Sequence, residues 1–280
     1  MKQNITVKEL RHRAEMPMIV LCIVLTILAW IAVFVSVFVL ESPLEDWAVP
    51  ILIGALSPFL AVIVIFRHHY WKEITNGVEI TEKQFPEIYQ VYVGLAKEMG
   101  FGNGKGVMAE IPRLYLKNGD GTLNAFASKC QLHKGYVVLY SDLMDIAYKE
   151  NDFEGIAFIL AHELGHIKCG HVSAWRTILQ PVAKMLFLEK SLTRAQEWTA
   201  DRCGYYYAPE GKRSMMVLSA GKNLYSKVDF DEFIRSVDNH KDGFWLKYSN
   251  FMADHAVGFR RIQAIKETEE KGWDVHGKML

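Results

Sequence analysis

The sequence predicts an α+β, mostly helical domain that contains a small antiparallel sheet and follows a two-helix transmembrane hairpin. Two long apolar runs in the first quarter of the chain predict the hairpin, because the remaining sequence has the mixed composition of a soluble domain. Short stretches bounded by turn residues predict the strands, and longer stretches with apolar residues at helical spacing predict the helices. We therefore expect a membrane anchor over residues 1–72 and one globular domain over residues 73–280.

The composition excludes several classes of function. The 280 residues include 32 basic and 32 acidic side chains, so the balanced charge gives no electrostatic reason to expect a nucleic-acid partner. The four cysteines, Cys22, Cys130, Cys169 and Cys203, form no C-x-x-C pair. This spacing argues against a disulfide framework and against a cysteine-type zinc site.

The two apolar runs differ in length and regularity. Residues 18–40 form a run of 23 residues without a charge. At about 1.5 Å per residue, a helix of this length crosses a hydrocarbon core of about 30 Å. Residues 48–66 form a run of 19 that includes prolines and a glycine, which membrane helices tolerate better than soluble ones. A cleaved signal peptide is the alternative for the first run, and a buried core hairpin is the alternative for the second.

The charges beside the two runs predict the orientation of the hairpin in a lipid bilayer. The connector, residues 41–47, is acidic and has no lysine or arginine. Basic residues flank the hairpin on its other side: Lys2, Lys8, Arg11, Arg13, Arg67 and Lys72. The positive-inside rule therefore predicts an integral protein of the cell or inner membrane with two crossings, whose termini and globular domain are cytoplasmic.

The first half of the globular domain is expected to contain one helix and three strands. Thr81 can cap an amphipathic helix over residues 82–99, which is followed by glycine-rich residues. Strands are expected over residues 111–117, 122–128 and 135–140, because turn residues separate these β-prone stretches. Their short connections favour an antiparallel arrangement.

Two capped helices are expected in the second half of the domain. Asn151 is expected to cap a helix that contains residues 162–166, His-Glu-Leu-Gly-His. Ser191 is expected to cap a second helix that ends near Gly204. Residues 175–188 lie between the two and are moderately apolar. Their charges, proline and length favour a helix on the core or at the membrane interface over a third crossing.

The segment 162–166 has the spacing of a metal-binding motif. Residues i and i+4 of a helix lie one turn apart on the same face, so His162 and His166 present two imidazoles to one point. Glu163 is poorly placed as a ligand but can hold a metal-activated water as general base. A surface helix with two solvated histidines is the alternative, because this short motif also occurs by chance.

A catalytic zinc site needs three protein ligands and one open position, and the best third ligand is Glu197 on the second helix. Asp201 lies one turn further along and could accept a hydrogen bond from an imidazole, which would fix its tautomer. Arg194 could pair with a carboxylate of this cluster or of the substrate, and an ordinary solvated charge is the alternative. His171 is out of register for the HExxHxxGxxH pattern and is expected to be solvated.

Three further segments accompany these residues in a fixed order. They are residues 124–127 (Asn-Ala-Phe-Ala), 135–139 (Gly-Tyr-Val-Val-Leu) and 255–262 (His-Ala-Val-Gly-Phe-Arg-Arg-Ile). Together with the HExxH motif and the Glu-x-x-x-Asp spacing at 197–201, they resemble the zinc metallopeptidase family of the membrane heat-shock peptidase HtpX and the CAAX prenyl endopeptidases.

The resemblance implies a zincin-like metallopeptidase fold. It implies that His162, His166 and Glu197 hold one zinc ion, that Glu163 is the catalytic base and that Asp201 supports the ligands. 

The resemblance also implies roles for residues outside the motif. Asn124 and His255 match positions that contact the substrate or the oxyanion, and Arg261 matches a buried structural arginine. A strand-end role for Asn124 and a helix-cap role for His255 are the alternatives. The strand at Gly135–Tyr140 would offer a free edge to an extended protein or peptide substrate.

The sequence therefore predicts a membrane-anchored zinc metalloendopeptidase that cuts proteins or peptides at the cytoplasmic face. Processing of CAAX substrates is not expected, because two crossings cannot form the closed membrane barrel of the prenyl endopeptidases. Two alternatives stay open: a non-catalytic membrane scaffold that binds zinc, and a zinc hydrolase of a non-peptide amide.

Overall fold

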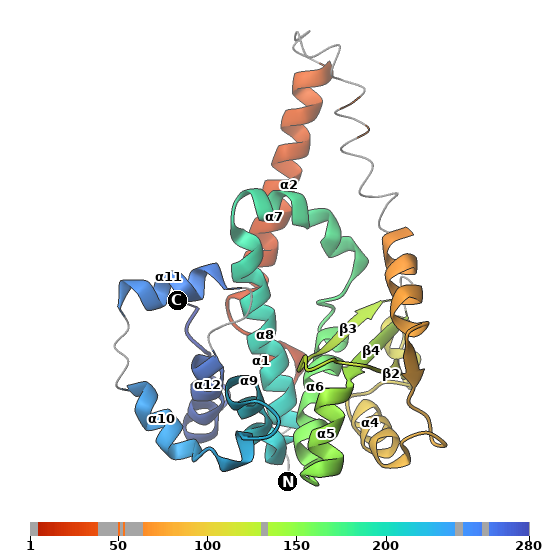
Figure 1. The fold of residues 1–280 in the computed structure, drawn as a ribbon. Coiled ribbons are helices and arrows are strands. Elements are labelled where there is room, and N and C mark those ends of the chain that lie inside the picture. Colours follow the sequence, from red (N-terminus) through yellow and green to blue (C-terminus); the bar gives the residue numbers. More distant parts are fainter. Residues whose placement is uncertain are drawn as a thin grey trace.

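The computed structural model describes residues 5–38, 50, 53, 64–129, 134–238, 243–253 and 258–279 (Figure 1). These residues are mostly helical and include one four-stranded sheet, which confirms the predicted fold class at this level. Helix α2 (Glu15–Phe38) projects from a domain that the other elements build. Helix α6 (Phe153–Lys168) lies at the centre of that domain, in contact with the sheet and with helix α8 (Leu188–Tyr207).

The sheet has the strand order β1-β2-β4-β3. Its strands are β1 (Gly77–Glu79), β2 (Arg113–Lys117), β3 (Ala125–Lys129) and β4 (Gly135–Tyr140). The pairs β1–β2 and β3–β4 are antiparallel, but β2 and β4 are parallel. The prediction of a fully antiparallel sheet is therefore wrong, because β4 inserts between β2 and β3 instead of following β3 at the edge.

The position of β4 also overturns the predicted peptide-binding edge. Strand β4 pairs with β2 on one side and with β3 on the other, so Gly135–Tyr140 has no free edge. Its consecutive apolar residues Val137, Val138 and Leu139 are all buried, as is typical of a central strand covered on both faces. Strand β3 is the edge strand on this side of the sheet.

Two helices of the domain begin at different residues from those predicted. Helix α4 (Pro86–Glu98) begins after Phe85, whose backbone is left-handed, and Pro86 occupies its first turn, where a missing N–H costs nothing. Helix α6 is capped by Asp152, whose carboxylate accepts the Gly155 N–H at 2.7 Å, and not by Asn151. Helix α5 (Ser141–Lys149) lies between β4 and α6 in the chain.

Helix α8 is longer at both ends than the sequence predicts. It begins at Leu188, so Ser191 lies within the helix, and it continues through Gly204 to Tyr207. Gly204 is needed for packing and not as a helix stop. A Cβ atom at this position would lie 3.0–3.2 Å from three ring atoms of Phe158, so glycine lets α8 approach α6 closely.

Among the described residues, α2 is the one helix that is long and apolar enough to cross a membrane. It begins three residues before the predicted run, and most of its apolar side chains are exposed. The predicted second run, residues 48–66, falls almost entirely outside the described residues. The chain is described again from residue 64, and residues 64–74 are helical.

The segment before α2 packs into the domain, although the sequence assigned it to the anchor. It contains the short helix α1 (Val7–Leu10), and Leu10 is fully buried. The Arg202 guanidinium of α8 donates hydrogen bonds to the Leu10 and Glu9 carbonyl oxygens at 3.0 and 2.9 Å. The His12 N–H donates to the Thr199 hydroxyl at 2.9 Å, so α8 holds this segment over its whole length.

Residues 175–188 form two short helical pieces that pack against α2, in keeping with a helix on the core. Leu179 and Ala183 are buried against Ile19 and Cys22 of α2. The pieces are η2 (Ala174–Leu179) and α7 (Gln180–Met185). The remaining helices are η1 (Gly106–Met108), η3 (Pro209–Met216), α9 (Val217–Ala220), η4 (Tyr225–Lys227), α10 (Phe230–Asp238), α11 (Phe244–Met252) and α12 (Gly258–Lys271).

Candidate metal centre

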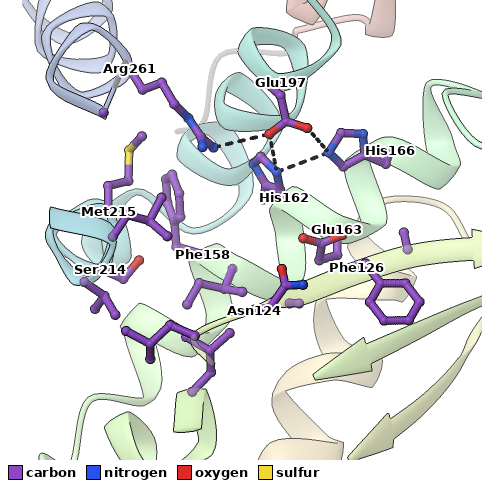
Figure 2. A pocket seen from close by; sticks show the side chains of 18 of the residues that line it. Asn124, Phe126, Phe158, His162, Glu163, His166, Glu197, Ser214, Met215 and Arg261 are labelled. Carbon is purple, nitrogen blue, oxygen red and sulfur yellow. Dashed lines mark hydrogen bonds and ion pairs between the residues drawn. The ribbon is translucent and has the colours of Figure 1, made fainter. Parts of the chain in front are cut away.

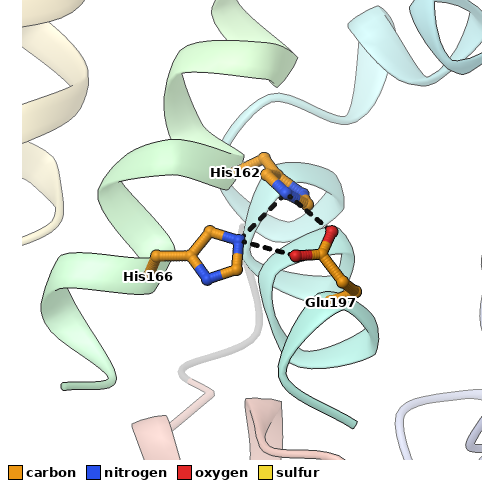
Figure 3. A group of neighbouring side chains, drawn as sticks. All are labelled: His162, His166 and Glu197. Carbon is orange, nitrogen blue, oxygen red and sulfur yellow. Dashed lines mark hydrogen bonds and ion pairs between the residues drawn. The ribbon is translucent and has the colours of Figure 1, made fainter. Parts of the chain in front are cut away.

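The structure brings the three predicted ligands to one point (Figure 3). The His162 and His166 Nε2 atoms are 3.1 Å apart, and the Glu197 carboxylate oxygens lie 3.5 Å from the first and 3.4 Å from the second. Donor atoms bound at about 2.1 Å to a shared tetrahedral ion lie about 3.4 Å from one another. Two imidazole nitrogens and one carboxylate oxygen are also a donor set that suits zinc. The residues present therefore fit a single divalent ion.

A glycine between the two histidines allows the ligand helices to meet. A Cβ atom at Gly165 would lie 2.8 Å from the Cys203 Cβ of α8, which is closer than real side chains approach. Because Glu197 lies on α8 and the histidines on α6, this contact controls the distance between the ligands.

We expect Gly165→Ala to push the two helices apart, to weaken zinc binding at least tenfold and to destabilise the chain by about 1–3 kcal/mol. Gly94→Ala on α4 is the matched control, since its Cβ would have no neighbour within 4 Å. The control should stabilise the chain by about 0.5–1 kcal/mol. Zinc content after dialysis and thermal unfolding check both results, and equal behaviour of the two variants would contradict the packing argument.

A buried ion pair supports the first histidine from behind. The Asp201 Oδ1 atom lies 3.0 Å from the His162 Nδ1 atom and is completely buried. Arg261 donates two hydrogen bonds to the same carboxylate, at 2.7 and 2.6 Å, and its guanidinium is 3.6 Å from Glu197. Burial by itself raises the pKa of Asp201, but the Arg261 and His162 charges hold that pKa below its ordinary value. The carboxylate is therefore ionised and fixes the orientation of the imidazole.

The ligands themselves have strongly shifted pKa values without an ion. Burial lowers the pKa of His162, but the Asp201 and Glu197 carboxylates outweigh it and raise the value to about 10. Burial lowers the pKa of His166 well below its ordinary value. A metal ion that binds here must therefore displace a proton from His162.

Glu163 lines the cavity beside the ligands (Figure 2). Burial raises the pKa of its carboxyl group to about 7, and the Glu197 charge adds to the effect. The His162 charge and a backbone hydrogen bond from Ala127 act in the opposite direction. A carboxylate with this pKa exchanges protons readily near neutral pH, as a general base must, and a bound divalent ion would lower the value.

The cavity in front of the ligands has a volume of about 740 Å³. Asn124 and residues 125–127 of the edge strand β3 form one wall, next to Glu163 (Figure 2). The opposite wall is largely apolar and contains Leu143, Phe158, Ile159, Met215, Val217 and Leu218. His162, His166 and Glu197 line the same cavity.

The structure describes two of the three remaining predicted site residues, Asn124 and Arg194. Asn124 is exposed and lines the cavity at the start of β3, whereas His255 lies outside the described residues. Arg194 is not solvated, so the alternative of an ordinary exposed charge is wrong, whereas its pairing with a carboxylate stays a prediction. It is fully buried and donates to the Phe251 and Ala253 carbonyl oxygens at 2.8 and 2.9 Å. These carbonyls lie at the C-terminal end of α11, where helix carbonyl groups need external donors.

Sequence reasoning missed two residues that lie behind the second histidine. His171 was expected to be solvated, but it is buried, and its Nδ1 atom is 2.9 Å from the His166 Nδ1 atom. Glu15 is buried next to His171 and belongs to the first turn of α2. Gly170, with a left-handed backbone, turns the chain back after α6 and was the one local signal for the His171 position.

Residues 82–183 match the model of peptidase family M48, the family of HtpX and the CAAX prenyl endopeptidases. The match confirms the resemblance seen in the sequence and indicates a metal-dependent peptidase. It covers α4, the strands β2–β4 and the HExxH helix, and it ends before Glu197. No curated protein and no solved structure gave a match.

Proposed function

From the match of its central segment to peptidase family M48, we propose that this protein is a membrane-anchored, zinc-dependent metalloendopeptidase. One observation supports the proposal most strongly: the ligand atoms of His162, His166 and Glu197 lie close together around one point, beside Glu163. A purely structural zinc site is closed by four protein ligands, whereas this cluster opens onto a large cavity.

The chemistry assigned to each side chain follows from its position. A bound zinc ion would polarise the scissile carbonyl group and make water a better nucleophile near neutral pH. Glu163 is placed to accept a proton from the attacking water and to deliver it to the leaving amine nitrogen. Asp201 and Arg261 keep His162 in the tautomer that leaves its Nε2 atom available as a ligand.

The edge strand β3 is the proposed binding surface for the substrate backbone. The Tyr140 N–H donates to the Asn124 carbonyl at 3.0 Å, so Asn124 faces β4. Backbone direction alternates along a strand, so Ala125 and Ala127 present their N–H and C=O groups to the cavity. The backbone hydrogen bond between Ala127 and Glu163 agrees with this alternation. An extended peptide that pairs with β3 would place a scissile bond beside Glu163.

We expect Ala125→Pro to lower kcat/KM for an unfolded protein about five- to tenfold, because it removes one outward N–H worth about 1 kcal/mol. Ala125→Ser retains the N–H and has a similar size, so it should retain full activity. Zinc content should not change in either variant. Equal kcat/KM values for the proline and serine variants would contradict pairing along β3.

Two features support the membrane anchor. Helix α2 leaves the domain at Glu15, and the chain is back on the domain at residues 64–74, where Glu73 pairs with Lys117 of β2 at 2.5 Å. If α2 crosses a bilayer, the return of the chain to the same domain requires a second crossing, in agreement with the positive flanks. In addition, Met185 and Phe187 are 69% and 65% exposed at the end of α7, beside α2. Such residues are suited to the lipid interface, with the domain on the cytoplasmic side.

The proposed function is tested by cleavage of casein by the detergent-solubilised full chain, before and after removal of metal with a chelator. We expect cleavage with one zinc per chain, loss of cleavage on chelation and recovery on adding zinc. A zinc-bound chain that cuts no unfolded protein would instead support the non-catalytic scaffold. A chain that hydrolyses only non-peptide amides, and that no extended peptide inhibits, would support the other alternative.

A further inference from the structure

Three side chains, those of His166, His171 and Glu15, lie in a row behind the metal centre. The His166 Nε2 atom faces Glu197, while its Nδ1 atom points away and lies 2.9 Å from the His171 Nδ1 atom. The His171 Nε2 atom is 3.1 Å from the Glu15 Oε1 atom, in an ion-pair contact whose angle departs from that of an ideal hydrogen bond. The three side chains thus connect a predicted metal ligand to the first turn of α2.

The Glu15 carboxylate is enclosed by partners from three parts of the fold. It is completely buried, and it pairs with Arg11 one turn earlier in the chain. Arg176 of η2 approaches it at 3.5 Å, and the Thr199 hydroxyl of α8 donates to it at 2.7 Å. Two guanidinium groups and a hydroxyl compensate the buried charge, so Glu15 is a carboxylate and lies in ion-pair contact with His171.

This arrangement selects one tautomer at each ring. Because the His171 Nε2 atom lies 3.1 Å from a carboxylate oxygen, it carries the ring proton, and a neutral His171 has a lone pair on Nδ1. That lone pair can only accept the Nδ1–H of His166, which leaves the His166 Nε2 lone pair directed at the metal position. His162 reaches the same state by a shorter route, because Asp201 contacts its Nδ1 atom directly. Both imidazole ligands are therefore oriented by a buried carboxylate, one of them through a second imidazole.

We propose that His171 and Glu15 are positioning residues for the metal ligand His166, so that the segment preceding α2 completes the metal centre. The inference rests on the proposed zinc-dependent function. It also means that the anchor and the peptidase domain are not separable units, because removal of residues 1–17 removes Glu15 and Arg11 from behind His166.

The test compares substitutions of two buried histidines in the detergent-solubilised full chain. His171→Leu fills the space but cannot accept the His166 proton, so it should weaken zinc binding about 10- to 100-fold. His171→Gln carries both an acceptor and a donor and should restore most of the affinity. His12→Leu is the matched control. His12 is 1% exposed, and its ring nitrogens contact the Gly277 carbonyl oxygen at 2.8 Å and the Ala14 N–H at 3.2 Å, so its ring is not part of the contacts from Glu15 through His171 to His166.

Zinc affinity is measured by competition with a chromophoric chelator, and the visible spectrum of the cobalt-loaded chain reports the coordination geometry. We expect His171→Leu to change both and His12→Leu to change neither, even where His12→Leu lowers the melting temperature. Glu15→Gln should weaken zinc binding in the native chain but not in a chain that already carries His171→Leu, because Glu15 acts through His171.

Native zinc affinity and an unchanged cobalt spectrum in folded His171→Leu would overturn the proposal. Equal losses of affinity in the His171→Leu and His12→Leu chains would also overturn it, since they would reveal a general effect of stability. Zinc affinity does not depend on hydrolysis. A chain that cuts no protein yet loses affinity with His171→Leu therefore refutes the peptidase function and supports the positioning role.

Discussion

Glu163→Gln is expected to lower kcat for an unfolded protein about 10³-fold while the chain keeps its zinc. Glutamine has the shape of glutamate but cannot accept a proton, and general base catalysis contributes about 10²–10⁴-fold to such reactions. Glu163 does not belong to the ligand cluster, so the affinity for zinc should change little. Casein cleavage and metal analysis of the same preparation measure the two effects separately.

Glu154→Gln provides the control for this substitution. Glu154 lies in the first turn of the same helix and is exposed, so the same chemical change there should leave kcat unaltered. Activity of Glu163→Gln within tenfold of the native chain would rule out Glu163 as the base. Loss of zinc together with activity would instead assign Glu163 a structural role.

Arg261→Ala is expected to lower the free energy of unfolding by about 3–5 kcal/mol, because it leaves the buried Asp201 carboxylate without its cation. The two hydrogen bonds at 2.7 and 2.6 Å are buried, and the Asp201 side chain has no access to water. Denaturant unfolding of the detergent-solubilised chain measures the loss. Zinc affinity should fall as well, since Asp201 would no longer hold His162.

Arg235→Ala is the matched control for the ion pair. Arg235 pairs with Glu232 on α10, but both side chains are largely exposed, at 71% and 65%. Exposed pairs contribute about 0–1 kcal/mol, so the unfolding free energy should hardly change. A loss below 1 kcal/mol for Arg261→Ala would show that Asp201 finds another partner, and it would refute the role assigned to this pair.

The features that could be predicted from the sequence are those that depend on local spacing. The two histidines could be identified because the helix fixes their spacing within one turn, whatever the rest of the fold does. Glu197 and Asp201 could be identified because a second helix repeats the same spacing. The bounds of β4 were equally local, since turn residues end the apolar stretch on both sides.

The errors concern partners that are distant in the chain. Arg194 has the spacing of an ordinary helix charge, and only the arrival of the α11 carbonyl groups makes it a buried structural residue. The parallel pairing of β4 with β2 depends on the path of the chain between β2 and β3, which side-chain alternation does not encode. The same is true of the edge that faces the cavity, which belongs to β3 and not to β4.

The sequence by itself determined the apolar helix, the bounds of strand β4 and the paired imidazoles, because each depends on residues within a few positions of one another. Tertiary structure alone decided that Glu15, in the first turn of α2, lies behind the predicted metal ligand His166, which is 151 residues later in the chain. The physical reason is burial. A carboxylate removed from water must find cations and donors, and folding supplies them from Arg11, Arg176, His171 and Thr199, which no sequence spacing connects.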